Sequence, residues 1–284
     1  DIEKIPAEKN TFGKGSGNAD RSQNKRDHVK APGEYAKIML PELTFPYLIP
    51  GQEVLLDDGK IHLKIVEKAE NVTENGGENT QEKRYFAKVL WGGLLKSRKS
   101  AALPGAKIYP PTLTNSDLAN IKIAKEMGVT GVMQPFVRDH SDLECVKEAL
   151  REAGAEDIRL FAKIENMDGV RKLEKLLPAA DEIVIARGDL GNAVHLWDLP
   201  GVQRQISEKC RAAGKPFMVV TQMLASMERS PVPTRAEVND IFHAVMDGAA
   251  SIMVTGETAV GDYPVEVIRY MVNTVRSAEK EENR

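Results

Sequence analysis

Two short segments near the middle of the chain carry residues suited to metal and phosphate chemistry. Residues 162–166 read Ala-Lys-Ile-Glu-Asn, and residues 186–191 read Ala-Arg-Gly-Asp-Leu-Gly. The carboxylates of Glu165 and Asp189 suit Mg²⁺, which takes one or two protein carboxylates and completes its shell with water and substrate oxygens. The ammonium group of Lys163 would then be available to a phosphoryl group or an enolate.

Lys163 and Glu165 lie at the end of a predicted buried strand. Residues 158–165 are largely apolar and have no helical period, which indicates a strand. Side chains alternate between the faces of a strand, so Lys163 and Glu165 point the same way. Taken alone, this pair is compatible with either a structural ion pair or a functional one.

The acid on the next segment favours the functional interpretation. Residues 168–177 predict an amphipathic helix, and residues 182–187 predict a second buried strand that ends in a turn at Gly188-Asp189. A strand-helix-strand crossover makes the two strands parallel, so both acids and the lysine reach the same edge of the sheet.

Composition excludes several classes of protein. The 284 residues are 42% hydrophobic and 29% charged with a formal net charge of −3, which is typical of a globular protein and provides no bulk positive field for nucleic acid or membrane. No apolar run approaches the roughly 20 residues that span a bilayer. The start lacks a signal peptide and an initiator Met, so we expect the chain to be cut from something longer.

Cysteine usage indicates a reducing compartment, which we expect to be the cytoplasm. Cys145 and Cys210 are far apart, and neither belongs to a Cys-x-x-Cys pair. The five histidines have no ligand spacing, so zinc is not expected.

The first third of the chain predicts a small antiparallel domain, which we place at residues 1–99. Residues 1–34 are polar and predict a mobile loop. An Asp58-Gly59 turn between apolar runs predicts a hairpin over residues 53–66, and another strand follows at residues 85–91. The basic segment 92–105 is either a solvated linker or a phosphate-holding loop.

Residues 100–284 predict five strands, each followed by a helix. Polar residues end all five strands, which favours a partial (β/α)₈ TIM barrel over a doubly wound sheet, because the latter uses this edge only near its switch point. Closure needs three more strands, which we expect upstream. The other predicted strands are 129–134, 216–221 and 251–255; the other predicted helices are 114–127, 139–153, 197–213, 234–246 and 265–278, and the predicted helix stops are Gly128, Gly154, Gly214 and Gly248.

The order and spacing of six motifs resemble the pyruvate kinase family from about Gly51 to Met271. The motifs are residues 92–105, 162–166, 186–191, 221–224 with 226–227, 233–238, and 256–259 with 263–266. The resemblance implies an α/β fold in which a small β domain is inserted after the third strand of a TIM barrel and caps its mouth. The chain then corresponds to that domain plus strands four to eight, without the first three strands and the C-terminal regulatory domain.

The resemblance also implies an activity, namely phosphoryl transfer from phosphoenolpyruvate to ADP in glycolysis, giving pyruvate and ATP. It implies Mg²⁺ or Mn²⁺ as cofactor, possible use of K⁺, and a homo-oligomer that in the family is usually a tetramer. We expect no nucleic-acid or membrane partner. The implied roles are metal binding by Glu165 and Asp189, catalysis by Lys163, substrate binding by Lys163, Gly188 and Thr221, and nucleotide binding by Lys99.

Several positions depart from the family pattern. Ser100 and Ala102 replace a Gly and an Asn, Pro135 replaces a Ser, residues 192–195 have lost a carboxylate, and Thr255 replaces a Ser. Segments that carry the family's substrate arginine and monovalent-cation ligands are also missing, so we expect no turnover by this piece alone. Two alternatives stay open, which are an inactive binding or regulatory protein of this fold and a metal-dependent lyase. Arg235 and Glu237 have an ordinary interpretation as charges at a helix start.

Overall fold

The computed structural model describes residues 3–4, 37–69, 84–97 and 99–282. Its contacts divide the chain into two compact units, Asp1–Tyr109 and Pro110–Arg284. The division falls after Tyr109 rather than after residue 99, because strand β6 (Ala101–Ala102) pairs with a strand of the first unit. Most of the predicted mobile loop at residues 1–34 lies outside the described residues.

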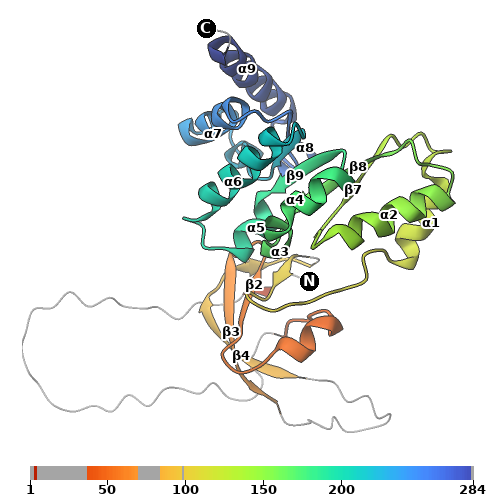
Figure 1. Ribbon diagram of the computed structural model, residues 1–284. Helices are drawn as coiled ribbons and strands as arrows, with labels where there is room; N and C mark the ends of the chain where they lie inside the picture. Colours follow the sequence, from red (N-terminus) through yellow and green to blue (C-terminus); the bar gives the residue numbers. More distant parts are fainter. Residues whose placement is uncertain (1–2, 5–36, 70–83, 98, 283–284) are drawn as a thin grey trace, which may run out of the picture. The chain divides into compact units, whose positions relative to one another are not determined.

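The first unit is built on an antiparallel sheet in the order β4-β3-β2-β6. Figure 1 labels β2, β3 and β4 of this sheet. The predicted hairpin is confirmed as β2 (Glu53–Leu56) and β3 (Ile61–Lys68), and the next predicted strand as β4 (Tyr85–Trp91). A short pair joins β1 (Glu3–Lys4) to β5 (Leu94–Leu95), and a 3₁₀ helix, η1, spans Glu42–Tyr47. The core of this unit consists of Leu48, Val54, Leu56, Ile61, Leu63, Ile65 and Leu103.

The second unit contains the five predicted strands in one parallel sheet, in the order β11-β10-β9-β8-β7. Neighbours in this sheet are consecutive in sequence, so the five strands show no switch point of the doubly wound kind. They do not close a barrel, in keeping with the expectation of a partial one. The strands are β7 (Gly131–Gln134), β8 (Arg159–Ile164), β9 (Glu182–Ala186), β10 (Phe217–Val220) and β11 (Ser251–Met253).

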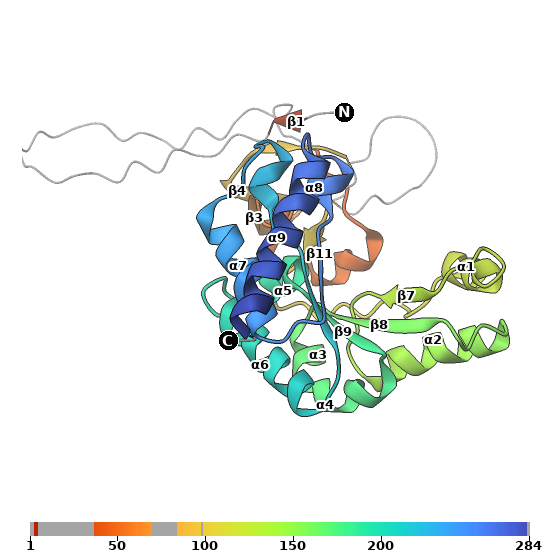
Figure 2. The same cartoon turned by 90° about the horizontal axis from the view of Figure 1, so that it is seen from above.

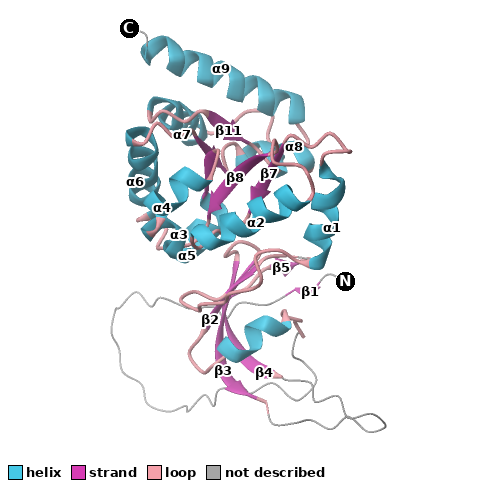
Figure 3. Ribbon diagram, turned by 45° about the vertical axis from the view of Figure 1, so that its right-hand side comes forward, coloured by secondary structure: helices cyan, strands magenta, loops and turns pink. Residues whose placement is uncertain are grey.

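Helices follow the strands and form an arc around the sheet (Figure 3), which Figure 2 shows from above. The predicted helix at residues 168–177 is wrong as a single element, because it breaks at Lys172. The predicted turn at Gly188-Asp189 is wrong too, since both residues belong to a helix. The helices are α1 (Asn115–Ala124), α2 (His140–Glu152), α3 (Met167–Arg171), α4 (Leu173–Leu176), η2 (Leu177–Ala179), α5 (Arg187–Ala193), α6 (Leu199–Ala212), η3 (Ala225–Glu228), α7 (Arg235–Met246), α8 (Gly256–Ala259) and α9 (Pro264–Glu282).

The two faces of the parallel sheet have different partners. Alternate residues such as Ile164, Ile183 and Ile185 join the large core formed with the helices. The residues between them form a separate cluster that contains only strand side chains: Phe161, Val184, Ala186, Met218, Val220 and Met253. Lys163 lies two residues after Phe161 and therefore projects from this second face, which is the inner face in a barrel.

Four helices end at the glycines that the sequence indicated, Gly128, Gly154, Gly214 and Gly248, all at positive φ. In each case the amide after the glycine bonds back to a carbonyl of the last helical turn, as Ala155 N does to Leu150 O at 2.9 Å. This is the Schellman pattern, which glycine adopts without steric cost. The motif precedes β7, β8, β10 and β11 in the chain and lies at the edge of the sheet where these strands begin.

Two observations bear on the cysteines and on membrane-spanning segments. Cys145 is exposed and Cys210 is buried, and both are free thiols. Burial raises the pKa of the Cys210 thiol to about 12. None of the described helices combines the length and the apolar character required to cross a bilayer.

Candidate functional site

Lys163 and Glu165 form an ion pair at the end of β8. Lys163 Nζ lies 2.7 Å from Glu165 Oε1, and the exposed fractions of the two side chains are 25% and 1%. The predicted common direction of these side chains is therefore confirmed. The carboxylate is buried while the ammonium group keeps an open side, so the pair combines a fixed acid with an accessible cation.

The second oxygen of Glu165 is held by the loop that follows β7. The backbone N–H of Phe136 donates to Glu165 Oε2 at 2.7 Å, and Phe136 adopts a left-handed φ of 52°. Pro135 removes the hydroxyl that the resemblance implied, but the next amide still reaches the carboxylate. Each carboxylate oxygen has a further lone pair, so Glu165 can accept these bonds and also bind a cation.

The start of α3 fits tightly beneath this loop. Asn166 donates to Val137 O at 3.1 Å and caps α3 by accepting from Gly169 N at 2.9 Å. A side chain at Gly169 would place its Cβ 2.6 Å from Val137 O. Glycine is thus required here by a close backbone approach, which helps to fix the loop that holds Glu165.

Asp189 and Gly188 lie in the first turn of α5, directly after β9. The register of the parallel strands sets Ile164 opposite Ile185, so β8 and β9 end at the same edge of the sheet. Asp189 is half-buried at this edge. The acid on the second strand is thus delivered to the predicted edge by a helix rather than by a turn.

Gly188 lies against Thr221, which follows β10. A Cβ at Gly188 would be 3.0 Å from Thr221 Cγ2 and 3.7 Å from Thr221 Oγ1. The structure therefore brings together two predicted site residues that are far apart in sequence. The lack of a side chain at residue 188 leaves its backbone open beside the Thr221 hydroxyl.

The backbone at Thr221 is strained. Thr221 and Gln222 have φ values of 79° and 56°, in the left-handed region. A β-branched residue such as Thr rarely adopts this conformation. Strain of this kind costs of order 1–3 kcal/mol per residue and persists only where surrounding contacts hold it.

Arg187 provides such contacts, and the sequence reasoning missed it. Its guanidinium donates to Thr221 O from Nε at 3.3 Å and from Nη2 at 2.9 Å. Its Nη1 also donates to both carboxylate oxygens of Asp240, at 2.8 and 2.7 Å. The sequence feature that could have identified Arg187 is its position directly between a buried strand and Gly188-Asp189.

Glu257 is a second residue that the sequence reasoning did not single out. It is 2% exposed and accepts from Leu224 N at 3.2 Å and from Thr255 N at 2.8 Å. It thereby ties the loop after β10 to the loop after β11. The signal in the sequence was an acid within the polar end of the last strand.

A buried network supports the loop after β7 from its other end. Asp142 is 3% exposed and accepts from Arg138 N at 2.8 Å and from Arg138 Nε at 3.0 Å, and it also accepts from Thr112. Burial raises the pKa of Asp142, but the bonds from Arg138 and Thr112 outweigh it and lower that pKa to about 2. The acid is therefore charged at neutral pH and fixes the start of α2.

Lys99 belongs to the first unit and has a different setting. Its Nζ lies 2.9 Å from Asp57 Oδ1, in the turn between β2 and β3. Burial raises the pKa of Asp57, but its bond to Lys99 and the charges of Lys60 and Lys99 hold that pKa below its usual value. The segment from residue 92 to 105 is thus not a simple solvated linker.

Ser100 holds the same turn. Its carbonyl accepts from Asp57 N at 3.0 Å, and its hydroxyl accepts from Asp58 N at 2.9 Å while donating to Asp58 Oδ1 at 2.6 Å. Asp57 and Asp58 both have left-handed φ values, 49° and 57°. The serine that departs from the family pattern therefore has a structural function, which is to fix the β2–β3 turn.

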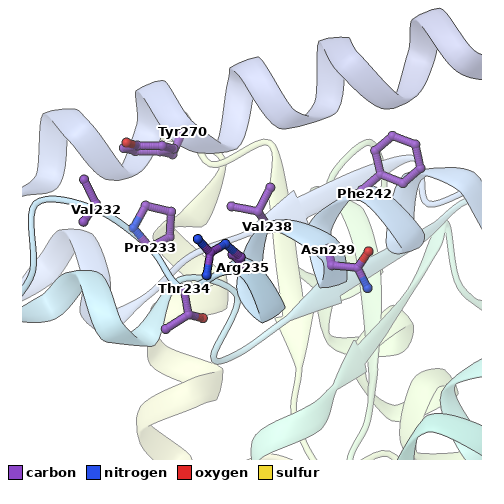
Figure 4. A pocket seen from close by; sticks show the side chains of 8 residues that line it. All are labelled: Val232, Pro233, Thr234, Arg235, Val238, Asn239, Phe242 and Tyr270. Atoms are coloured by element: carbon purple, nitrogen blue, oxygen red, sulfur yellow. The ribbon is translucent and has the colours of Figure 1, made fainter.

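Arg235 and Glu237 do not join the carboxyl-edge cluster. Glu237 completes a capping box with Thr234 and accepts from Ser226 N at 2.7 Å, as expected of a structural helix start. Arg235 lines a separate pocket of about 360 Å³ between α7 and α9 (Figure 4). Its described lining includes none of the predicted site residues and consists of Val232, Pro233, Thr234, Arg235, Val238, Asn239, Phe242 and Tyr270.

The donor set at the carboxyl edge fits a hard divalent cation. Among the described residues, no three His, Cys, Asp or Glu side chains gather into a metal-binding group. Glu165 and Asp189 offer two carboxylates from neighbouring strand ends, which is the usual protein contribution to a Mg²⁺ site that takes its other ligands from water and substrate. A site completed by three or more protein side chains, such as structural zinc, does not fit this donor set.

The order of the strands, the arc of helices and the acidic and basic groups at the carboxyl edge define a protein of the (β/α)-barrel class. The sequence from residue 23 to 268 matches the family described as "Pyruvate kinase, barrel domain". The chain therefore belongs to the pyruvate kinase family.

Curated relatives agree with this assignment. The pyruvate kinase of Geobacillus stearothermophilus is 40% identical over 233 residues, and that of Bacillus licheniformis is 38% identical over 230 residues. Each match covers 81% of this chain and 38% of the relative. The pyruvate kinase of Chlamydia trachomatis serovar D is 34% identical over 242 residues, covering 85% of this chain and 47% of the relative. The chain thus spans less than half the length of these relatives.

Proposed function

We propose that this chain is part of a pyruvate kinase, which transfers the phosphoryl group of phosphoenolpyruvate to ADP. The observation that carries the proposal is the Lys163–Glu165 pair at the carboxyl edge of the sheet, with Asp189 at the end of the neighbouring strand. In the reaction, the P–O bond of phosphoenolpyruvate breaks and a P–O bond to the β-phosphate of ADP forms. The resulting enolate takes a proton at its methylene carbon to give pyruvate.

The protein's contribution to such a reaction is positioning and electrostatics. Glu165 and Asp189 would hold Mg²⁺ or Mn²⁺, and the bound ion would neutralise charge on the phosphoryl and carboxylate oxygens. Lys163 would stabilise the charge that moves from the phosphoryl group to the enolate oxygen. Gly188 and Thr221 would orient the substrate carboxylate, with Thr221 on the side from which the proton arrives.

Further parts of the proposal concern the setting of the enzyme. Lys99 would contact the nucleotide phosphates, and K⁺ would assist. We also propose that the protein works in the cytoplasm, in glycolysis, as a homo-oligomer. Family membership supports these assignments.

The proposal is tested on the complete protein, with whatever sequence flanks this chain. A coupled assay with Mg²⁺, phosphoenolpyruvate and ADP should report ATP formation. Exchanging Lys163 for Met should abolish turnover, whereas Mn²⁺ binding measured by calorimetry should be mostly intact. Lys125→Met is the matched control, because Lys125 pairs with Asp157 at 2.9 Å on the side of the strands' amino ends.

The competing hypothesis is a protein of this fold that binds without turnover. It is motivated by Pro135 and by residues 192–195, where a hydroxyl and a carboxylate of the family pattern are missing. The intact Lys163–Glu165 pair argues against it. Binding of phosphoenolpyruvate or Mn²⁺ by the complete wild-type protein without ATP formation would establish this alternative instead. Unchanged turnover of Lys163→Met would remove the proposed mechanism.

A further inference from the structure

We propose that Arg187 is a positioning residue, which together with Asp240 holds the left-handed turn at Thr221 against Gly188 and so fixes the Thr221 hydroxyl for the protonation of the enolate. The inference rests on the proposed function, which gives Thr221 its role. It adds two residues, Arg187 and Asp240, to the groups on which the reaction depends.

The left-handed turn at Thr221 does not hold itself in place. Thr221 and Gln222 are consecutive non-glycine residues at φ values of 79° and 56°. Both are free to relax to ordinary φ values unless other groups oppose the change. Relaxation would rotate the peptide that carries Thr221 O and displace the adjacent hydroxyl.

Arg187 holds the carbonyl that would move. Two of its N–H groups converge on Thr221 O, at 3.3 and 2.9 Å, and Nη2 also lies 2.8 Å from Met223 Sδ. The Arg187 side chain is 13% exposed, so these bonds are largely sheltered from competition by water. The carbonyl is therefore held from one side by a fixed cation.

Asp240 in turn fixes the guanidinium of Arg187. Both of its oxygens accept from Arg187 Nη1, at 2.8 and 2.7 Å, and it projects from α7. One guanidinium thus connects α5, the Thr221 turn and α7. Lysine cannot reproduce this arrangement, because its ammonium group lacks the planar fork that serves a carbonyl and a carboxylate together.

Arg187 and Asp240 together form what we call the clamp, and the clamp adjoins the proposed substrate site. Arg187 directly precedes Gly188, so the group that holds Thr221 O belongs to the same helical turn as the backbone that faces the Thr221 side chain. A Cβ at Gly188 would lie only 3.0 Å from Thr221 Cγ2. The clamp therefore helps to set the spacing between these two proposed substrate contacts.

The test compares Arg187→Lys and Asp240→Asn with wild type in the complete protein. Two readouts are used, which are kcat and KM in the coupled assay and the exchange of pyruvate methyl protons with D₂O by NMR. The exchange reports enolate protonation in reverse, without ADP. A displacement of about 1 Å in a catalytic group costs on the order of 10²-fold, so we expect losses of about 10- to 100-fold in both kcat and exchange, with KM for ADP and Mn²⁺ binding unchanged.

A rescue variant distinguishes the loss of positioning by Arg187 from a general loss of protein structure. Gln222→Gly replaces a left-handed glutamine with a residue that accepts this conformation freely, so the turn depends less on the clamp. Added to Arg187→Lys, it should restore activity at least about threefold, because glycine removes part of the strain that the clamp opposes. Arg159→Lys is the matched control, since Arg159 lies 3.3 Å from Glu182 at the opposite edge of the sheet, and it should keep wild-type kcat.

A crystal structure of Arg187→Lys supplies an independent result. Thr221 is expected to leave the left-handed region or to shift its carbonyl. The clamp has no positioning role if Thr221 keeps its φ and position in this variant. The same conclusion follows if activity and metal binding fall together and Gln222→Gly does not restore activity. An inactive wild-type enzyme would overturn the proposed function, whereas the position of Thr221 in the variant would still decide whether the clamp exists.

Discussion

Left-handed backbone positions occur at both edges of the parallel sheet, but different residues occupy them. At the amino edge, the left-handed positions that connect helices to strands are occupied by Gly128, Gly154, Gly214 and Gly248. At the carboxyl edge, left-handed positions are occupied by Phe136, Thr221 and Gln222. Glycine adopts these φ values without cost, whereas the other residues are strained.

The difference shows at which edge of the sheet particular side chains are retained in spite of backbone strain. Each strained residue at the carboxyl edge adjoins a predicted site residue or is one, since Phe136 N bonds to Glu165 and Thr221 faces Gly188. The amino edge also has an ion pair, between Arg159 and Glu182. Its left-handed positions are nevertheless occupied by glycines, which are not strained there. Strain is thus retained at the edge where the residues are expected to act on a substrate.

The largest expected effect concerns the two buried glutamates, one at each edge. Glu165→Gln keeps the shape of the side chain but removes its charge, and we expect kcat to fall by about 10³-fold, the upper end of the loss caused by removing one electrostatic group from an active site. Glu182→Gln, which alters the contacts of Glu182 with Arg159 and Ser251, should keep kcat within about threefold, because it lies at the edge away from the proposed chemistry. The coupled assay on the complete protein measures both, and equal losses would erase the contrast between the edges.

The next largest expected effect concerns how the stability of the fold depends on pH. The pKa of Asp142 is about 2 in the folded protein against 3.8 ordinarily, so the folded pKa is the lower one and the carboxylate stabilises the fold above pH 3.8. This contribution is lost as the pH falls through 3.8 toward 2. The shift corresponds to about 2 kcal/mol.

Asp142→Asn should therefore lower the free energy of unfolding by about 2 kcal/mol at neutral pH and flatten its decline in acid. Urea denaturation at neutral pH and in acid, followed by circular dichroism, measures both effects. Asp157→Asn is the control, because the Asp157–Lys125 pair is exposed and its removal should cost far less. An Asp142→Asn protein with wild-type stability at neutral pH would contradict the buried network.

A smaller effect is expected at the amino edge from Gly154→Ala. Gly154 has a φ of 63°, and a Cβ there would meet no atom within 4 Å, so the substitution introduces backbone strain and nothing else. It should cost about 1 kcal/mol, the usual penalty of a left-handed alanine. Thermal unfolding would show it, and an unchanged melting temperature would mean that the helix end relaxes.

The smallest effect is expected from Gln222→Gly at the carboxyl edge. Relief of about 1 kcal/mol of strain is offset by the larger conformational entropy that glycine brings to the unfolded chain, so the net change in stability should lie within about 0.5 kcal/mol. The same unfolding experiment tests it. A large destabilisation would show that Gln222 makes contacts that hold the turn, and the two edges would then differ less than we infer.

Much of the frame could be predicted from local patterns. Apolar runs fixed the five strands, glycines fixed four helix ends, and the alternation along β8 placed Lys163 beside Glu165. Each of these features depends on residues within about one helical turn or one strand, where the sequence carries a periodic signal. The motifs of the pyruvate kinase family could be recognised for the same reason.

The remaining features depend on contacts between distant parts of the chain, and only the tertiary structure decided them. Arg187 lies 34 residues from Thr221 and 53 from Asp240, and Phe136 lies 29 from Glu165. No period in the sequence records such pairs, because they arise when neighbouring strands bring their ends together. The sequence by itself therefore determined which elements form and which residues reach the carboxyl edge. The packing of the strands determined how the backbone at Phe136 and Thr221 is held there, because strain persists only where long-range contacts oppose its release.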